Sequence, residues 1–210
     1  MKKNFKINVW SSTEEYKLDR KQILKEVDKV FSSGQLILGK NVKSFEANFS
    51  KYLNLNYGIG VNSGTDAIQI ALMSAKIGKG DEVITAPNTA VPTVSAIVSC
   101  GAKPVFVDIN QDDYLIDVNK IEKSITRKTK AIIPINLYGQ CADYDKILLI
   151  AKKNKLIVIE DCAQSAGSFY KKSPSGSFGH MSAFSFYPTK NLGAYGDGGF
   201  IGTSIKKYAD

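Results

Sequence analysis

The sequence predicts an α/β protein: a three-layer α/β/α arrangement around a mostly parallel, seven-stranded sheet. Short segments rich in β-branched and aromatic residues recur along the chain, and helical segments separate most of them. Strands that alternate with helices indicate right-handed crossovers and a parallel sheet covered on both faces. The predicted strands are residues 57–61, 81–86, 104–109, 130–135, 156–161, 182–187 and 198–203.

The last two predicted strands have no long helix between them, so we expect an antiparallel element there. Helices are expected at 12–33, 42–53, 65–75, 93–100, 117–125 and 143–154. Ser12 and Glu15 have the spacing of a capping box at the start of the first helix. The final residues, "SIKKYAD", are typical of a helix that is just beginning.

Composition limits the classes of protein that fit. The chain has 210 residues, a formal charge of +8 and only two arginines, Arg20 and Arg127. Because base reading and phosphate forks favour arginine, we expect no nucleic-acid partner. No apolar run reaches membrane-spanning length and no secretory signal is present, so a cytoplasmic protein without membrane contact is expected. The three cysteines fit neither a zinc site nor a disulfide framework and are expected to be free thiols.

A phosphate site is predicted where the first strand ends. Residues 62–66, "NSGTD", open a helix directly after the strand "YGIGV". Parallel sheets bind ligands outside the carboxyl ends of their strands, and a helix N-terminus attracts anions. Gly64 allows the backbone to approach a ligand, and Thr65 adds a hydroxyl. An ordinary helix cap with nothing bound explains the same residues.

Two further side chains follow strands in the same way. Asp161 comes at the end of the apolar strand "LIVIE", where a partly desolvated carboxylate needs a partner. Lys190 lies in the turn "YPTKN" after the strand "AFSFY". Taken singly, Asp161 is better explained as a capping or salt-bridging acid at a strand end, and Lys190 is explained as a surface lysine. Together with the phosphate turn they are the three contacts that pyridoxal phosphate needs: a phosphate cradle, an acid for the pyridine nitrogen and a Schiff-base lysine.

Other chemistries are disfavoured. The single histidine, His180, cannot make a metal site alone, so no metal is expected and His180 is interpreted as structural. A Ser–His–Asp triad would have to use it, so the sequence disfavours a hydrolase.

From Gly39 onward the sequence resembles the DegT/DnrJ/EryC1/StrS sugar aminotransferases. The resemblance is carried by "NSGTDAIQIAL", "GDEVITAPNTAVPTVSAI", "GAKPVFVDI", "NLYGQCADYD", "VIEDCAQSAGSFY" and "GSFGHMSAFSFYPTKNLGAYGDGGF". It implies the large domain of the aspartate-aminotransferase-like fold, with residues 1–38 as an N-terminal helical arm and 39–210 as the cofactor-binding domain. Family members continue into a small C-terminal domain, which this chain is expected to lack.

The resemblance also implies roles for individual residues. Gly64, Thr65 and Ser185 would bind the phosphate of pyridoxal phosphate, and Gln164 would lie near the ring and its hydroxyl oxygen. Asp161 and Lys190 would be the catalytic pair, with Asp161 on the pyridine nitrogen and Lys190 as the Schiff-base lysine.

Four positions depart from the common family pattern. Ala90 stands where an aromatic residue often stacks on the cofactor, and Asn136 where a histidine is frequent. Cys141 replaces a proline, and His180 replaces an acidic residue. The change at Ala90 leaves ring stacking to some other residue or removes it.

The implied function is amino transfer from an amino acid, glutamate in most of the family, to a keto group of a dTDP- or UDP-linked deoxysugar. Such reactions serve deoxyamino-sugar, polysaccharide and O-antigen biosynthesis, and the implied assembly is a homodimer with shared active sites. Two alternatives stay open: an inactive cofactor-binding or assembly fragment, and a pyridoxal-phosphate-dependent sugar dehydratase. The family's dehydratases have histidine where this chain has Lys190, so lysine favours amino transfer.

Overall fold

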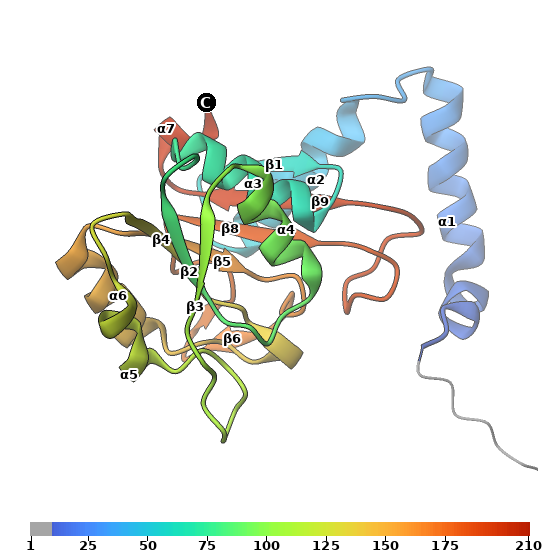
Figure 1. Ribbon diagram of the computed structural model, residues 1–210. Helices are drawn as coiled ribbons and strands as arrows, with labels where there is room; N and C mark the ends of the chain where they lie inside the picture. The colour runs from blue at the N-terminus through green and yellow to red at the C-terminus, as the bar shows by residue number, and fades with distance from the viewer. Residues whose placement is uncertain (1–9) are drawn as a thin grey trace, which may run out of the picture. The chain divides into compact units, whose positions relative to one another are not determined.

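The structure is a computed structural model that describes residues 10–210 (Figure 1). The chain divides into two compact units, residues 1–44 and 45–210. Helix α2 (Lys40–Tyr52) continues across the division, so the domain boundary expected after residue 38 remains a prediction. Residues 1–9 of the predicted arm lie outside the described residues.

Helix α1 (Thr13–Ser33) makes up most of the first unit that is described. It ends at Gly34, which has a φ of 68° and donates its N–H to the carbonyl of Phe31. The predicted capping box is wrong: the Ser12 side chain makes no capping hydrogen bond. The reason is that Ser12 already has helical angles, φ −91° and ψ −3°, whereas a side-chain cap needs an extended residue.

The second unit is built on the predicted seven-stranded sheet, in the order β1-β9-β8-β5-β4-β2-β3. The pairs β5–β8, β4–β5, β2–β4 and β2–β3 are parallel, while β9 is antiparallel to both β1 and β8. The fold class is therefore confirmed, and the antiparallel element is β9 with both of its neighbours. The strands are β1 (Tyr57–Val61), β2 (Glu82–Thr85), β3 (Lys103–Phe106), β4 (Thr129–Ile133), β5 (Ile157–Asp161), β8 (Met181–Ser185) and β9 (Gly199–Thr203).

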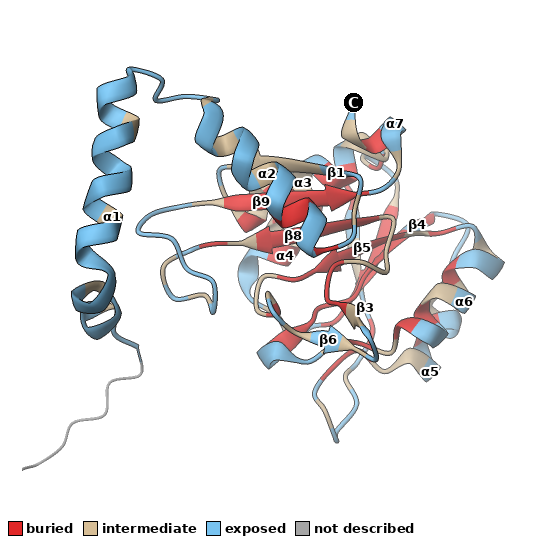
Figure 2. Ribbon diagram, turned by 180° about the vertical axis from the view of Figure 1, so that it is seen from behind, coloured by how far each residue is buried: buried red, intermediate tan, exposed pale blue. Residues whose placement is uncertain are grey.

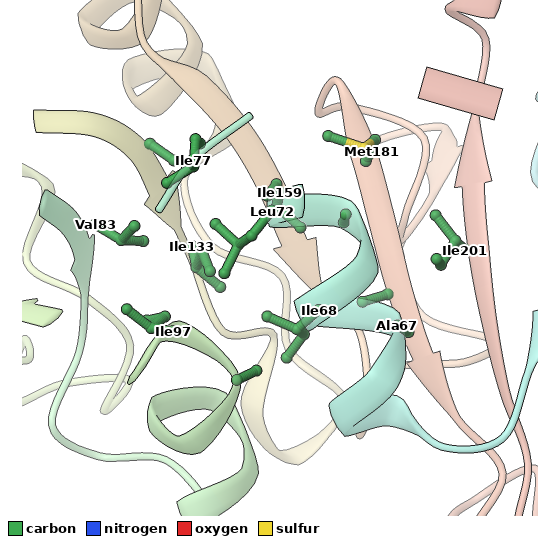
Figure 3. Close-up of a cluster of buried hydrophobic side chains, with 14 of the residues drawn as sticks. Ala67, Ile68, Leu72, Ile77, Val83, Ile97, Ile133, Ile159, Met181 and Ile201 are labelled. Carbon is green, nitrogen blue, oxygen red and sulfur yellow. The ribbon is translucent and has the colours of Figure 1, made fainter. Parts of the chain in front are cut away.

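Helices cover both faces of this sheet. On one face lie α3 (Gly64–Ser74), α4 (Val91–Ser99) and the short α7 (Lys206–Ala209). Figure 3 shows Ile68 and Leu72 of α3 directed at Ile133 and Ile159 of the strands. On the other face α5 (Val118–Ile121) and α6 (Tyr144–Asn154) cover Ile132 and its neighbours. Alternate strand residues thus face two cores, as a sheet buried on both sides requires.

Local differences from the expected elements are small. The helix predicted at 117–125 breaks at Ile121 and continues as a 3₁₀ turn, η1 (Glu122–Ser124). A second 3₁₀ turn, η2 (Leu137–Gly139), and a two-stranded hairpin of β6 (Phe169–Tyr170) and β7 (Ser173–Pro174) were not predicted. Among the described residues no helix is both long and apolar enough to cross a bilayer.

The topology brings three chain segments to one edge of the sheet. Strands β1, β5 and β8 run in the same direction, because β9 is antiparallel to β1 and β8 and β5 is parallel to β8. Their carboxyl ends therefore share an edge, although they end at residues 61, 161 and 185. Figure 2 shows the interior of this sheet as largely buried.

Within the second unit, Phe49, Phe184 and Phe200 form an aromatic cluster at strands β8 and β9. Phe184 of β8 is 1% exposed, and its ring centroid lies 5.1 Å from that of Phe49 and 6.2 Å from that of Phe200. Both contacts are edge-on, the geometry that aromatic pairs favour. This cluster supports β8 one residue before Ser185.

Replacing Phe184 by alanine is expected to lower the free energy of unfolding by about 3–5 kcal/mol, because it leaves a cavity in this cluster. Urea denaturation measures the change. Phe169→Ala is the control, since Phe169 is 57% exposed and should change stability by less than about 0.5 kcal/mol. Equal effects of the two substitutions would show that the cluster does not support the sheet.

Candidate active site

The turn between β1 and α3 has free backbone donors. Ser63 has extended angles and caps α3, its Oγ accepting the N–H of Asp66 at 3.1 Å. The N–H groups of Gly64 and Thr65 belong to the first turn of the helix, where no intrahelical acceptor exists. The cap that was one interpretation of this motif is present, and it leaves these two amides and the Thr65 hydroxyl for a ligand.

This turn is seated against the ends of β8 and β9. A Cβ on Gly64 would lie 2.7 Å from Cβ of Ser185, which is closer than real atoms approach. A Cβ on Gly199 would lie 2.2 Å from the carbonyl oxygen of Ser63. Glycine at residue 64 therefore allows the turn to lie beside Ser185, and glycine at residue 199 allows β9 to lie against Ser63.

Asp161 ends the central strand β5 and is 4% exposed. Its Oδ2 accepts a hydrogen bond from the Thr93 hydroxyl at 2.7 Å, and its Oδ1 accepts the N–H of Ala163 at 3.1 Å. Burial raises the pKa of the Asp161 carboxyl, while these two bonds and the charge of Lys190 oppose that rise. A carboxylate buried in this way is stabilised by any cation that enters beside it.

Lys190 follows β8 in a tight turn. Its N–H donates to the carbonyl of Tyr187 at 2.8 Å, and the residue is half-buried. Its positive charge acts on Asp161, yet none of the ion pairs among residues 10–210 joins the two side chains. The acid and the amine are thus close enough to interact and are not in contact.

A cavity of about 360 Å³ lies between them. All six residues expected at the site line it: Gly64, Thr65, Asp161, Gln164, Ser185 and Lys190. Its walls also include Thr89, Ala90, Pro92, Thr93, Tyr187 and Asp197. Residues from three strand ends and two helix starts thus meet around one space of the size of a small-molecule site.

Gln164 is oriented by the backbone of η2. Its Oε1 accepts the N–H of Tyr138 at 3.2 Å, which leaves the Nε2 hydrogens to donate to a ligand. The backbone turns sharply at this point: Tyr138 has a φ of 57°, in the left-handed region that few residues other than glycine adopt.

Thr89 and Thr93 are wall residues that the sequence reading missed. They lie four residues apart, Thr93 in the first turn of α4, and their hydroxyl oxygens are 2.7 Å apart. The signal that could have found them is their position after the strand β2, whose carboxyl end lies at the same edge as that of β5.

Of the four positions that depart from the family pattern, only Ala90 lines the cavity, where it contributes a methyl group. Asn136 is fully buried: its Oδ1 accepts from the N–H of Ala142 and the hydroxyl of Tyr144, and its peptide N–H donates to the carbonyl of Asp161. Asn136 therefore anchors the strand end that carries Asp161.

The remaining two departures lie outside the cavity. The Nδ1 of His180 accepts the N–H of Val158 at 3.0 Å, in keeping with a structural role. Cys141 is a half-buried thiol whose pKa is raised by burial. All three cysteines are free, and the described residues contain no group of His, Cys, Asp and Glu side chains that could hold a metal ion.

Comparison with known proteins places the chain in a family. Residues 17–210 match the model of the DegT/DnrJ/EryC1/StrS aminotransferase family. A dTDP-3-amino-3,4,6-trideoxy-alpha-D-glucose transaminase from Micromonospora megalomicea subsp. nigra is 47% identical over 93% of this chain and 52% of its own length. A UDP-N-acetyl-3-dehydro-alpha-D-glucosamine 3-aminotransferase from Acidithiobacillus ferrooxidans is 44% identical over 88% of this chain and 50% of its length.

Solved structures agree. A DegT/DnrJ/EryC1/StrS aminotransferase from Brucella abortus superposes with a TM-score of 0.94 at 36% identity, covering 98% of this chain and 57% of that one. NtdA from Bacillus subtilis, with bound cofactor PMP, superposes with a TM-score of 0.88 at 36% identity, covering 99% of this chain and 48% of that one.

The protein has the large-domain fold of these aminotransferases, with a cavity at the carboxyl ends of its strands. The chain belongs to the DegT/DnrJ/EryC1/StrS aminotransferase family. It spans about half the length of the relatives it matches.

Replacing Asp161 by asparagine is expected to stabilise the cofactor-free chain at neutral pH, because the substitution removes a buried charge. The raised pKa of Asp161 means that the folded state binds its proton more tightly than the unfolded state. The contribution of Asp161 to the free energy of unfolding should therefore fall as the pH rises above about 4, the unfolded value, and the advantage of Asp161→Asn should grow over the same range.

Urea unfolding between pH 4 and 8 measures this difference, with the exposed Asp112→Asn as control. A variant less stable than wild type at pH 7 would show that the bonds from Thr93 and Ala163 outweigh the cost of burying the carboxylate.

Proposed function

We propose that this chain carries the pyridoxal phosphate site of an aminotransferase. The enzyme moves an amino group from an amino acid, glutamate as the expected donor, to a keto group of a nucleotide-linked deoxysugar. The observation that carries the proposal is the pairing of Asp161 and Lys190: a buried acid and a half-buried amine face one cavity without contacting each other.

The residues present fit this cofactor at three points. The free amides of Gly64 and Thr65, with the hydroxyls of Thr65 and Ser185, would bind its phosphate. Asp161, whose burial calls for a cation, would hold the protonated pyridine nitrogen. Gln164 can donate from Nε2 to the ring's hydroxyl oxygen.

Lys190 supplies the covalent anchor and the moving proton. Its Nζ would hold the cofactor covalently. Once free, the same Nζ would take the proton from the donor's α-carbon, hold it and deliver it back within the site. The bound cofactor supplies an electron sink for the negative charge that this proton leaves behind.

Asp161 acts through the ring nitrogen without touching the reacting carbon. By keeping a proton there, its carboxylate would stabilise negative charge as it develops, in a site that is already desolvated. Because Asp161 is only 4% exposed, little water contacts this carboxylate.

The substrate class is supported by the relatives, whose names specify dTDP- and UDP-linked amino sugars. Lysine rather than histidine at residue 190 favours amino transfer over dehydration. The free thiols of the three cysteines support a reducing compartment, and the cytoplasm is the location we propose.

The cavity has too little positive charge for the substrates that we propose. Among the described residues that line it, Lys190 is the cation and Asp161 and Asp197 are the anions. A dicarboxylate donor and a sugar diphosphate need more positive charge than this. We propose that the missing cations come from a partner copy in a homodimer and from the part of the longer relatives that this chain does not span.

The same observation favours a second candidate function for the chain by itself. With one cation in its cavity, the 210-residue chain would bind cofactor and transfer little amine. It would then act as a cofactor-binding fragment, as the sequence left open.

Lys190 is expected to be the lysine that reacts with pyridoxal phosphate. After incubation and borohydride reduction, peptide mapping should find the pyridoxyl group on Lys190 in the wild type. The exposed Lys172→Ala variant should be labelled equally, and Lys190→Ala should lose the label. A main adduct at another lysine, or undiminished labelling of Lys190→Ala, would refute the assignment.

Extending the chain at its C-terminus to the relatives' length is expected to raise amine transfer by about 100-fold or more, because cations absent from the cavity stabilise the reacting complex. The assay follows release of 2-oxoglutarate from glutamate with a dTDP-linked keto-sugar. Equal turnover would eliminate the fragment interpretation, and sugar conversion without stoichiometric loss of glutamate would indicate a dehydratase.

A further inference from the structure

Two threonines, one just before α4 and one in its first turn, form a chain of hydroxyl groups that reaches the buried carboxylate of β5. The Thr93 hydroxyl donates to Asp161 Oδ2 at 2.7 Å, and Thr89 Oγ1 lies 2.7 Å from Thr93 Oγ1. Thr93 is 2% exposed and Thr89 is half-buried. A hydroxyl has one hydrogen, and that of Thr93 is used on Asp161. Thr89 must therefore be the donor of the other bond, so the chain runs from Thr89 through Thr93 to Asp161.

The carboxylate is held at both of its oxygens. Oδ2 is fixed by Thr93 and Oδ1 by the N–H of Ala163, and the two donors belong to different parts of the fold. Rotation of the carboxylate would break at least one of these bonds. Its remaining lone pairs are left for a donor in the cavity that Asp161, Thr89 and Thr93 all line.

We propose that Thr93, oriented by Thr89, is a positioning residue that fixes the Asp161 carboxylate and keeps the shared proton on the ring nitrogen of bound pyridoxal phosphate. This rests on the proposed function, since it concerns the same cavity.

Because Thr93 is the donor in its hydrogen bond to Asp161, that bond influences which group holds the shared proton. A donor to the ionised carboxylate makes that carboxylate a weaker base, and the bond from Thr93 opposes the rise in the pKa of Asp161 that burial causes. When a carboxylate and a ring nitrogen share one proton, the weaker base loses it to the other. Without the hydroxyl, the proton moves towards Asp161 and the ring is the poorer electron sink.

Replacing Thr93 by valine removes the hydroxyl and nearly conserves the shape, whereas Thr93→Ser keeps the hydroxyl. In the chain loaded with pyridoxal phosphate labelled with ¹⁵N in its ring, the ¹⁵N chemical shift reports whether the nitrogen carries the proton. Thr93→Val is expected to move this shift towards the neutral value. It should also weaken cofactor binding by about 2- to 10-fold, because a carboxylate that is no longer held in place must be ordered when the ring binds.

Thr93→Ser should restore both wild-type values, and Ser95→Ala on the same helix should change neither. Thr89→Val removes only the outer hydroxyl and should move both the shift and the affinity in the same direction as Thr93→Val, by a smaller amount. This variant decides the matter if Thr93→Val does not fold.

A wild-type ¹⁵N shift and wild-type affinity in folded Thr93→Val, or in Thr89→Val when Thr93→Val is unfolded, would overturn the inference. Failure of the proposed function looks different. In that case borohydride fixes no cofactor on Lys190 in the wild-type chain, whereas here Lys190 is labelled in every variant and only the shift and the affinity change.

Discussion

The constraint on which the site depends is a carboxylate buried at the end of the central strand β5. Glu160 and Asp161 are adjacent there, and each is less than 5% exposed. Glu160 accepts three backbone N–H groups, from Gly176, Phe178 and Gly179, so the fold itself satisfies it. Asp161 accepts only two donors and faces a cavity. The first acid is therefore structural, and the second has capacity left for a cationic ligand.

Much of this arrangement could be predicted from the sequence, because the parallel topology converts positions along the chain into positions in space. Apolar runs separated by helices define the strands, and parallel strands end at a common edge. Gly64 and Lys190 follow strands and Asp161 ends one, so their meeting around one cavity needed no knowledge of side-chain conformation. The pairing of β9 with β1 was less accessible, because the sequence does not indicate which strand lies on the side of β9 away from β8.

What the sequence could not supply depends on orientation within an element. The hydroxyl of Thr93 reaches Asp161 only because of how α4 is rotated against the sheet, and spacing alone does not fix that rotation. The capping box failed for a related reason: Ser12 has the right neighbour but the wrong backbone angles. In the sequence Asn136 was only a departure from a family pattern. Its four side-chain hydrogen bonds depend on the folded structure and could not be predicted.

The most direct measurement is a crystal structure of the chain soaked with pyridoxal phosphate. The predicted result is continuous density from Lys190 Nζ to the cofactor, with the ring nitrogen hydrogen-bonded to the Asp161 carboxylate and the phosphate on the amides of Gly64 and Thr65. A cofactor bound with its ring nitrogen turned away from Asp161, or bound outside this cavity, would contradict the central claim that the buried acid exists to hold a cationic ring.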